Sequence, residues 1–193
     1  MKKLLLAVVF VFTLFCLCAC HEDDEYTQLN KVIATDYAET KIEVQTDAGN
    51  GTLNSTITVK KQAGKSTVTY RVEKFTEISV GQIPSEYVTV YEGTEEVVNG
   101  EVTSQTGDAL EGISFADVTG LPFVFKEQYF ENAVFDNGVF SAKVFGPGYF
   151  TSGRVSGCTD MRVTFDYGGE QKVLTMVYTD ANGALVKVVY TLK

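Results

Sequence analysis

Residues 160–192 read DMRVTFDYGGEQKVLTMVYTDANGALVKVVYTL and indicate the fold most clearly. The segment opens with strict alternation, in which apolar Met161, Val163 and Phe165 alternate with polar Arg162 and Thr164. Such alternation is typical of a strand that buries one face. Gly168-Gly169 and the Asp-Ala-Asn-Gly run at 180–183 supply the residues that tight hairpin turns require. The segment therefore predicts three antiparallel strands joined by two short turns.

The same pattern extends toward the N-terminus. Alternating residues recur at 52–60 and 67–73, and further turn signals include Glu92-Gly93 and Asn99-Gly100. Because the turns are short, we expect consecutive strands to pair as a meander. Residues 105–128 are interrupted by glycine and proline and are expected to form an irregular loop. The predicted strands lie near 41–47, 52–61, 65–76, 87–92, 95–104, 129–136, 139–145, 160–168, 171–180 and 184–192.

The fold class predicted from these elements is mostly β, with little helix, in a single domain. The antiparallel meander can take two forms, a curved open half-barrel or a sandwich of two packed sheets, because both produce the same alternation. Thirteen Phe and ten Tyr provide enough apolar area for one substantial core.

The N-terminus is predicted to be a targeting segment. Lys2 and Lys3 precede an apolar run that ends at Leu17-Cys18-Ala19-Cys20, and acidic residues follow directly. The run is short for a membrane span, so cleavage is the better interpretation. The last four residues resemble the bacterial lipobox, which implies cleavage after Ala19 and acylation of Cys20.

This resemblance sets the predicted domain boundaries and localisation. Residues 1–19 are the predicted signal peptide, 20–40 a flexible acidic tether with a short helical turn near 29–34, and 41–193 the β domain. We expect the protein in the cell envelope, lipid-anchored to the outer membrane or cell surface of a Gram-negative cell, or to the outer leaflet of a Gram-positive plasma membrane. The acidic residues after Cys20 resemble an export tag of surface lipoproteins, with a plain solvated tether as the alternative.

Charge and residue types exclude several function classes. Without residues 1–19 the chain has 14 basic and 25 acidic residues, a formal charge of −11, so nucleic acid is an unfavourable partner. The one histidine is His21, which removes histidine-based catalysis from the folded part. Cys158 has no predicted disulfide partner and is interpreted as a small buried hydrophobe, with an exposed cross-linking thiol as the alternative.

No catalytic residue, metal site or cofactor is predicted. Asp47, Asp136 and Asp180 lie in turns, where their side chains stabilise the backbone. Glu95 and Glu96 are neighbours on a predicted strand, so they should point to opposite faces and cannot act as a pair. We therefore expect a non-enzyme.

An aromatic-rich stretch provides the candidate binding site. Its members have two interpretations: they line an apolar groove for an acyl chain, a peptide or sugar rings, or they fill the core. Core filling is the favoured interpretation because aromatic side chains carry most of the burial in small β domains. The candidate groove residues are Phe123, Phe125, Phe130, Phe140 and Tyr149.

The order of elements over residues 40–192 resembles the LolA-like half-barrel of lipoprotein carriers. That resemblance rests on layout alone, and it implies an incomplete curved barrel whose concave side receives acyl chains or a helical plug. The expected function is non-catalytic binding of an apolar ligand, a lipid or acyl chain, or of a partner protein, by a monomer held to the membrane. The alternative is a structural or adhesion module on the cell surface without a ligand cavity.

Overall fold

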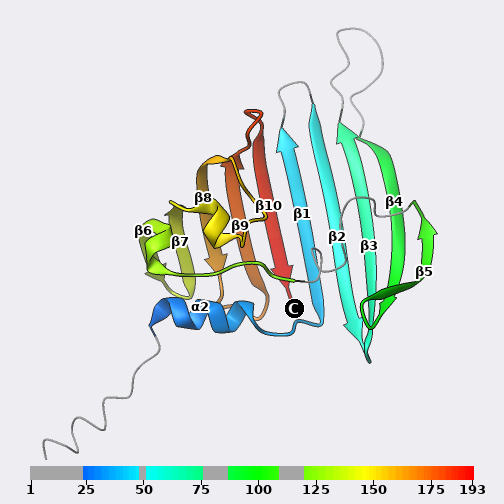
Figure 1. Ribbon diagram of the computed structural model, residues 1–193, viewed down its shortest axis with the longest axis horizontal. Helices are drawn as coiled ribbons and strands as arrows, with labels where there is room; N and C mark the ends of the chain where they lie inside the picture. Colours follow the sequence, from blue (N-terminus) through cyan, green and yellow to red (C-terminus); the bar gives the residue numbers. More distant parts are fainter. Residues whose placement is uncertain (1–23, 48–50, 76–86, 109–119) are drawn as a thin grey trace, which may run out of the picture.

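The computed structural model describes residues 24–47, 51–75, 87–108 and 120–193. Ten antiparallel strands form one open sheet, in the order β5-β4-β3-β2-β1-β10-β9-β8-β7-β6 (Figure 1). The mostly β antiparallel fold class is thus confirmed. The strands are β1 (Glu39–Asp47), β2 (Thr52–Gln62), β3 (Lys65–Phe75), β4 (Tyr87–Val98), β5 (Glu101–Gly107), β6 (Phe130–Asp136), β7 (Val139–Val144), β8 (Thr159–Asp166), β9 (Lys172–Thr179) and β10 (Leu185–Leu192).

The sheet consists of two meanders joined at a seam. Strands β1 to β5 pair consecutively, and so do β6 to β10, as the short turns predicted. The seam is the antiparallel pairing of β1 with β10, in which Val44 faces Val188. Strands β5 and β6 follow each other in sequence but lie at opposite edges of the sheet. All ten strands are hydrogen-bonded into one continuous open sheet.

The predicted turn at Glu92-Gly93 is wrong. Strand β4 continues through both residues, and the chain reverses at Asn99-Gly100, where φ is +53° and +83°. Gly93 has a different role, because a Cβ at this position would collide with the Tyr70 hydroxyl and the carbonyl oxygen of Asp108. Tyr70 is 1% exposed and donates its hydroxyl to that carbonyl. The glycine therefore makes room for a buried tyrosine inside a strand.

The flexible tether predicted for residues 20–40 is partly replaced by a docked helix, α2 (Glu25–Ile33). Asp24 caps the helix by accepting a hydrogen bond from the Thr27 N–H at 2.7 Å. Leu29 is fully buried and Ile33 is 7% exposed. The folded domain thus begins before residue 41, because the helix buries one apolar side in the core.

The helix-bearing face of the sheet contains the core of the β6–β10 half. Helix α2, the irregular segment 120–126, the short helix η1 (Glu127–Tyr129) and helix α4 (Pro147–Phe150) accompany these strands (Figure 1). In β8, alternate residues are buried, among them Met161 and Phe165, whereas the residues between them are exposed. The alternation in the sequence therefore corresponds to one buried face, as predicted for this strand.

Candidate functional site

Most of the candidate groove residues are in the core. Phe123, Phe125 and Phe140 are 5%, 1% and 0% exposed. Phe125 is at the centre, with its ring centroid between 5.3 and 5.8 Å from those of Phe130, Phe140, Phe150 and Phe165. Rings at these separations are in mutual contact and leave no channel between them. All three side chains are therefore packed in the core, and Phe125 also borders the cleft beside the first turn of α2.

The other two groove residues behave differently from each other. Phe130 is half-buried, and its ring lies 5.1 Å from Phe140, so it borders the same cluster. Tyr149 is 73% exposed and turns away from the core to stack on Tyr129, with ring centroids 5.7 Å apart. The five predicted residues thus do not line one surface.

A side-chain amide ties helix α2 to the aromatic core. Asn30 donates from Nδ2 to the carbonyl oxygen of Phe125 at 2.7 Å, and the Phe125 N–H donates to Asn30 Oδ1 at 2.8 Å. The amide satisfies both backbone groups of an irregular segment that has no strand partner at this point. This contact was not predicted because residue 30 lies in the predicted tether, although Tyr26, Leu29 and Ile33 have helical spacing.

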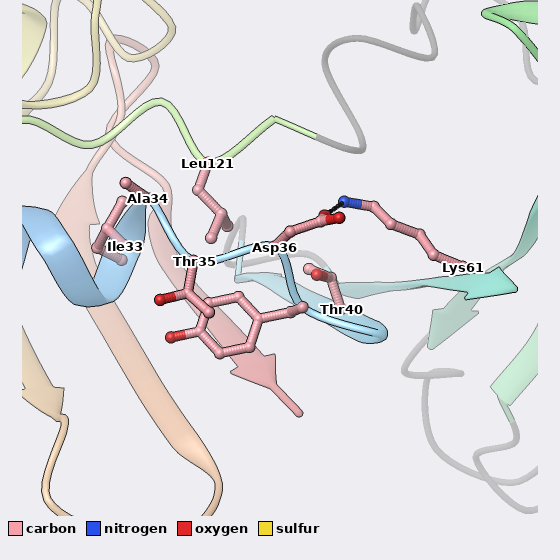
Figure 2. Close-up of a pocket in the computed structure, with 8 residues that line it drawn as sticks. Ile33, Ala34, Thr35, Asp36, Thr40, Lys61 and Leu121 are labelled. Atoms are coloured by element: carbon pink, nitrogen blue, oxygen red, sulfur yellow. Dashed lines mark hydrogen bonds and ion pairs between the residues drawn. The ribbon is translucent and has the colours of Figure 1, made fainter. Parts of the chain in front are cut away.

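A small pocket lies between the end of α2 and the start of the sheet (Figure 2). It has a volume of about 270 Å³, and Leu121 extends into it from the opposite segment. The Lys61 ammonium and the Asp36 carboxylate form an ion pair at 2.5 Å on its border. Burial raises the pKa of Tyr37, whose hydroxyl donates to the Val32 carbonyl at 2.8 Å. Lys61 and Asp36 are paired with each other, and the Tyr37 hydroxyl is bound to a backbone carbonyl. The pocket therefore offers small polar contacts rather than a set of catalytic groups.

A larger cleft, of about 590 Å³, lies beside the first turn of α2. Three carboxylates from two elements line it, those of Asp24, Glu25 and Glu127, together with Lys126. All four residues are exposed, and Asp24 already accepts the capping hydrogen bond of the helix. Burial raises the pKa of the Tyr26 hydroxyl in this cleft, and the three negative charges raise it further. The cleft is therefore acidic and well solvated.

Three aromatic residues near this cleft are linked by one ring stack and one backbone hydrogen bond, and we call them the aromatic patch: Tyr129, Phe145 and Tyr149. Phe145 and Tyr149, at 71% and 73% exposed, are the most exposed of the large apolar side chains that the structure describes. The Phe145 N–H donates to the Tyr129 carbonyl at 2.8 Å, which joins the two segments. Lys126 Nζ lies 5.9 Å from the centroid of the Tyr129 ring. The patch thus combines apolar surface with one nearby cation.

The two edges of the sheet differ. All seven residues of β5 are exposed, and among the described residues this strand pairs with β4 alone. Its sequence, EVTSQTG, contains neither Lys nor Pro. At the opposite edge, β6 carries an irregularity in register between Glu131 and Val134, with Asn132 at a φ of +53°. Bulges, lysines and prolines are the usual protection of edge strands. Both edge strands carry such an irregularity, because β5 also shifts register against β4 between Val102 and Ser104. They differ in exposure: every residue of β5 is exposed, whereas Phe130 and Phe135 of β6 pack against the core.

The described residues provide little for acid-base or nucleophilic chemistry. Burial raises the pKa of the half-buried Cys158 thiol and raises the pKa of Tyr190 to about 12, so both keep their protons at neutral pH. Glu95 is 9% exposed, whereas Glu96 on the other face pairs with Lys65. The two carboxylates therefore lie apart, as predicted.

Metal ligands and membrane-spanning helices are two further features of the part of the chain that the structure describes. No group of three or more Asp, Glu, Cys or His side chains is arranged to hold a metal ion there. No helix in the same residues has the length and apolar character needed to cross a membrane.

Comparisons with known proteins assign no family. No family model matches the chain, and no curated protein matches it. Among solved structures, a match was found to a bifunctional dehydratase-cyclase domain in ambruticin biosynthesis. It is 11% identical, the match covers 88% of this chain and 81% of that one, and the TM-score is 0.21. A similarity at that level supports no statement about the fold or the activity of this chain.

Proposed function

We propose that this chain is a non-catalytic, lipid-anchored protein of the cell envelope whose β domain binds a partner protein along strand β5. The anchor is Cys20, at the end of the lipobox-like Leu17-Cys18-Ala19-Cys20. The partner adds an extended segment to the open edge of the sheet, which is a common mode of peptide recognition.

The observation that carries this proposal is the full exposure of edge strand β5. Strand β5 presents seven exposed residues without Lys, Pro or an internal glycine before Gly107. An edge strand offers a row of backbone donors and acceptors to any extended chain, and proteins that do not use such an edge normally block it. Both edge strands have one register irregularity, but β6 is anchored by Phe130 and Phe135, which pack against the core, whereas every residue of β5 is exposed.

Protein binding is preferred to binding of an apolar ligand because of the aromatic side chains. The ligand version depended on Phe123, Phe125 and Phe140 facing a groove, and these residues are packed in the core. The pocket in Figure 2 and the acidic cleft at α2 are lined largely by polar or charged groups. Neither provides the mainly apolar lining that is usual for a lipid site.

The anchor is tested by the Cys20→Ser variant, with Cys18→Ser as the matched control. We expect Cys20→Ser to lose acylation and to leave the membrane fraction, because the thiol is the site of attachment. Cys18→Ser keeps a small residue and should be processed normally. Mass spectrometry of the mature protein and membrane fractionation measure both effects. Acylation that persists in Cys20→Ser would overturn the anchor.

The edge is tested with a photo-crosslinking residue placed at Gln105 of β5 in the protein's own host. We expect a discrete crosslinked product that disappears in the Ser104→Lys/Thr106→Lys variant, because lysines block strand addition. Thr164→Lys is the control, since it adds the same side chain to an exposed position of the interior strand β8. A product that survives the β5 lysines, or no product at all, would contradict the proposed edge.

A further inference from the structure

The aromatic patch has no role in strand addition, because it lies at the β6–β7 end of the molecule and β5 lies at the other edge (Figure 1). Phe145 and Tyr149 are more than 70% exposed, whereas the neighbouring Phe150 is fully buried. Large apolar side chains exposed within one region of the surface mark a contact site. The patch is therefore a candidate contact surface.

The length of the chain before the structure begins limits which surface is near. Only residues 21–23 separate Cys20 from Asp24, where the described structure starts. Four extended residues span at most about 14 Å. An acyl group on Cys20 would consequently hold the first turn of α2 close to the lipid surface. In Figure 1 this first turn lies on the β6 side of the sheet.

The patch lies at the same end of the molecule. Glu127, the first residue of η1, lines one cleft together with Asp24 and Glu25. Tyr129 ends η1 and stacks on Tyr149 at 5.7 Å, and its carbonyl accepts the Phe145 N–H. The first turn of α2 and η1, which carries Tyr129 of the patch, therefore border one cleft at the same end of the domain.

The chemistry of the patch fits the boundary between lipid headgroups and acyl chains. Tyrosine is enriched at that boundary because its ring is apolar and its hydroxyl stays hydrated. Lys126, near the Tyr129 ring, can reach a headgroup phosphate while its stem follows the apolar surface. The carboxylates of Asp24, Glu25 and Glu127 would repel a strongly anionic surface. The expected lipid is thus zwitterionic.

We propose that the aromatic patch of Tyr129, Phe145 and Tyr149 inserts into the headgroup region of the zwitterionic membrane that holds the anchor. The inference rests on the proposed acylation of Cys20. The acyl chains and the patch are then two contacts with one bilayer, and two contacts restrict the orientation of the domain. The β5 edge, on the opposite side of the sheet, is directed away from the lipid and stays accessible to a partner protein.

A single fluorescent reporter tests the insertion, because the chain contains no tryptophan. Full-length Phe145→Trp protein is purified from bacterial membranes and reconstituted in phosphatidylcholine vesicles with or without a nitroxide-labelled acyl chain. The matched control is Val102→Trp, at a 52% exposed apolar position on β5. We expect the nitroxide to quench the reporter at 145 at least about twofold more strongly than the reporter at 102. Adding Tyr149→Ser to Phe145→Trp should reduce that quenching.

The outcomes separate this inference from the anchor. Protein that carries acyl chains by mass spectrometry and floats with the vesicles, but shows equal quenching at both positions, overturns the insertion and leaves the anchor intact. The patch would then be available to a partner protein. Protein without acyl chains overturns the anchor and the insertion together. Quenching at 145 that requires added phosphatidylglycerol overturns the preference for a zwitterionic surface.

Discussion

Individual side chains explain where this sheet departs from the regular pattern. Gly93 interrupts the alternation of β4 and resembles a turn residue, yet it lies within a continuous strand beneath the buried Tyr70. The same tyrosine holds Asp108, and the Asp108 N–H donates to the Glu92 carbonyl at 3.0 Å. These contacts attach the end of β5 to β4, and they are possible only because residue 93 has no side chain.

Gly93→Ala should destabilise the protein by about 2 kcal/mol, because a new methyl group in a packed site forces its neighbours to move. Guanidinium unfolding followed by circular dichroism measures the change. Gly148→Ala is the control, since a Cβ there meets only the Val155 carbonyl oxygen at an ordinary 3.9 Å. Combining Gly93→Ala with Tyr70→Phe should recover part of the loss. Equal stability of the two alanine variants would contradict the steric role of Gly93.

Helix α2 shows how a polar segment becomes part of a core. Its single buried side carries Leu29 and Ile33, and Asn30 binds both backbone groups of Phe125. The helix has nine residues, too few to be stable alone in water, so its structure depends on this docking. Removing the Asn30 side chain would leave the Phe125 N–H and carbonyl without these partners.

Asn30→Ala should lower the free energy of unfolding by about 2 kcal/mol or more, because unsatisfied buried backbone groups cost about 1–3 kcal/mol each. It should also increase hydrogen exchange throughout α2. Gln28→Ala, on the exposed side of the same helix, is the control and should change little. If the two variants unfold and exchange alike, the amide does not hold the helix.

The assembly of the entire sheet depends on contacts between the two ends of the chain. Strand β1 pairs with β10 over eight residue pairs, from Thr40–Leu192 to Asp47–Leu185. The backbone also joins Glu39 and Lys193 by two hydrogen bonds, at 2.9 and 3.0 Å. This seam is the described strand pairing that joins the two meanders. The two halves should therefore lose stability together when it is damaged.

Val188→Asp places a charge at a seam position that is 6% exposed. We expect the free energy of unfolding to fall by more than about 3 kcal/mol, because the carboxylate is buried and unpaired. Hydrogen exchange should rise in β2–β3 and in β7–β8 alike. Lys187→Asp, at the neighbouring exposed position, is the control. If hydrogen exchange rises in only one of the two meanders, each meander is stable by itself.

The sequence by itself predicts most strand positions, most turns and the one-sided burial of strands such as β8. These features depend on residues that are two to four positions apart. The pairing of β1 with β10, the space that Tyr70 needs above Gly93 and the docking of α2 by Asn30 join residues far apart in the chain. Local sequence patterns do not predict such long-range contacts. The aromatic residues illustrate the difference: their number predicted a large core, but the burial of Phe125 and the exposure of Tyr149 depend on which strands the chain brings beneath them.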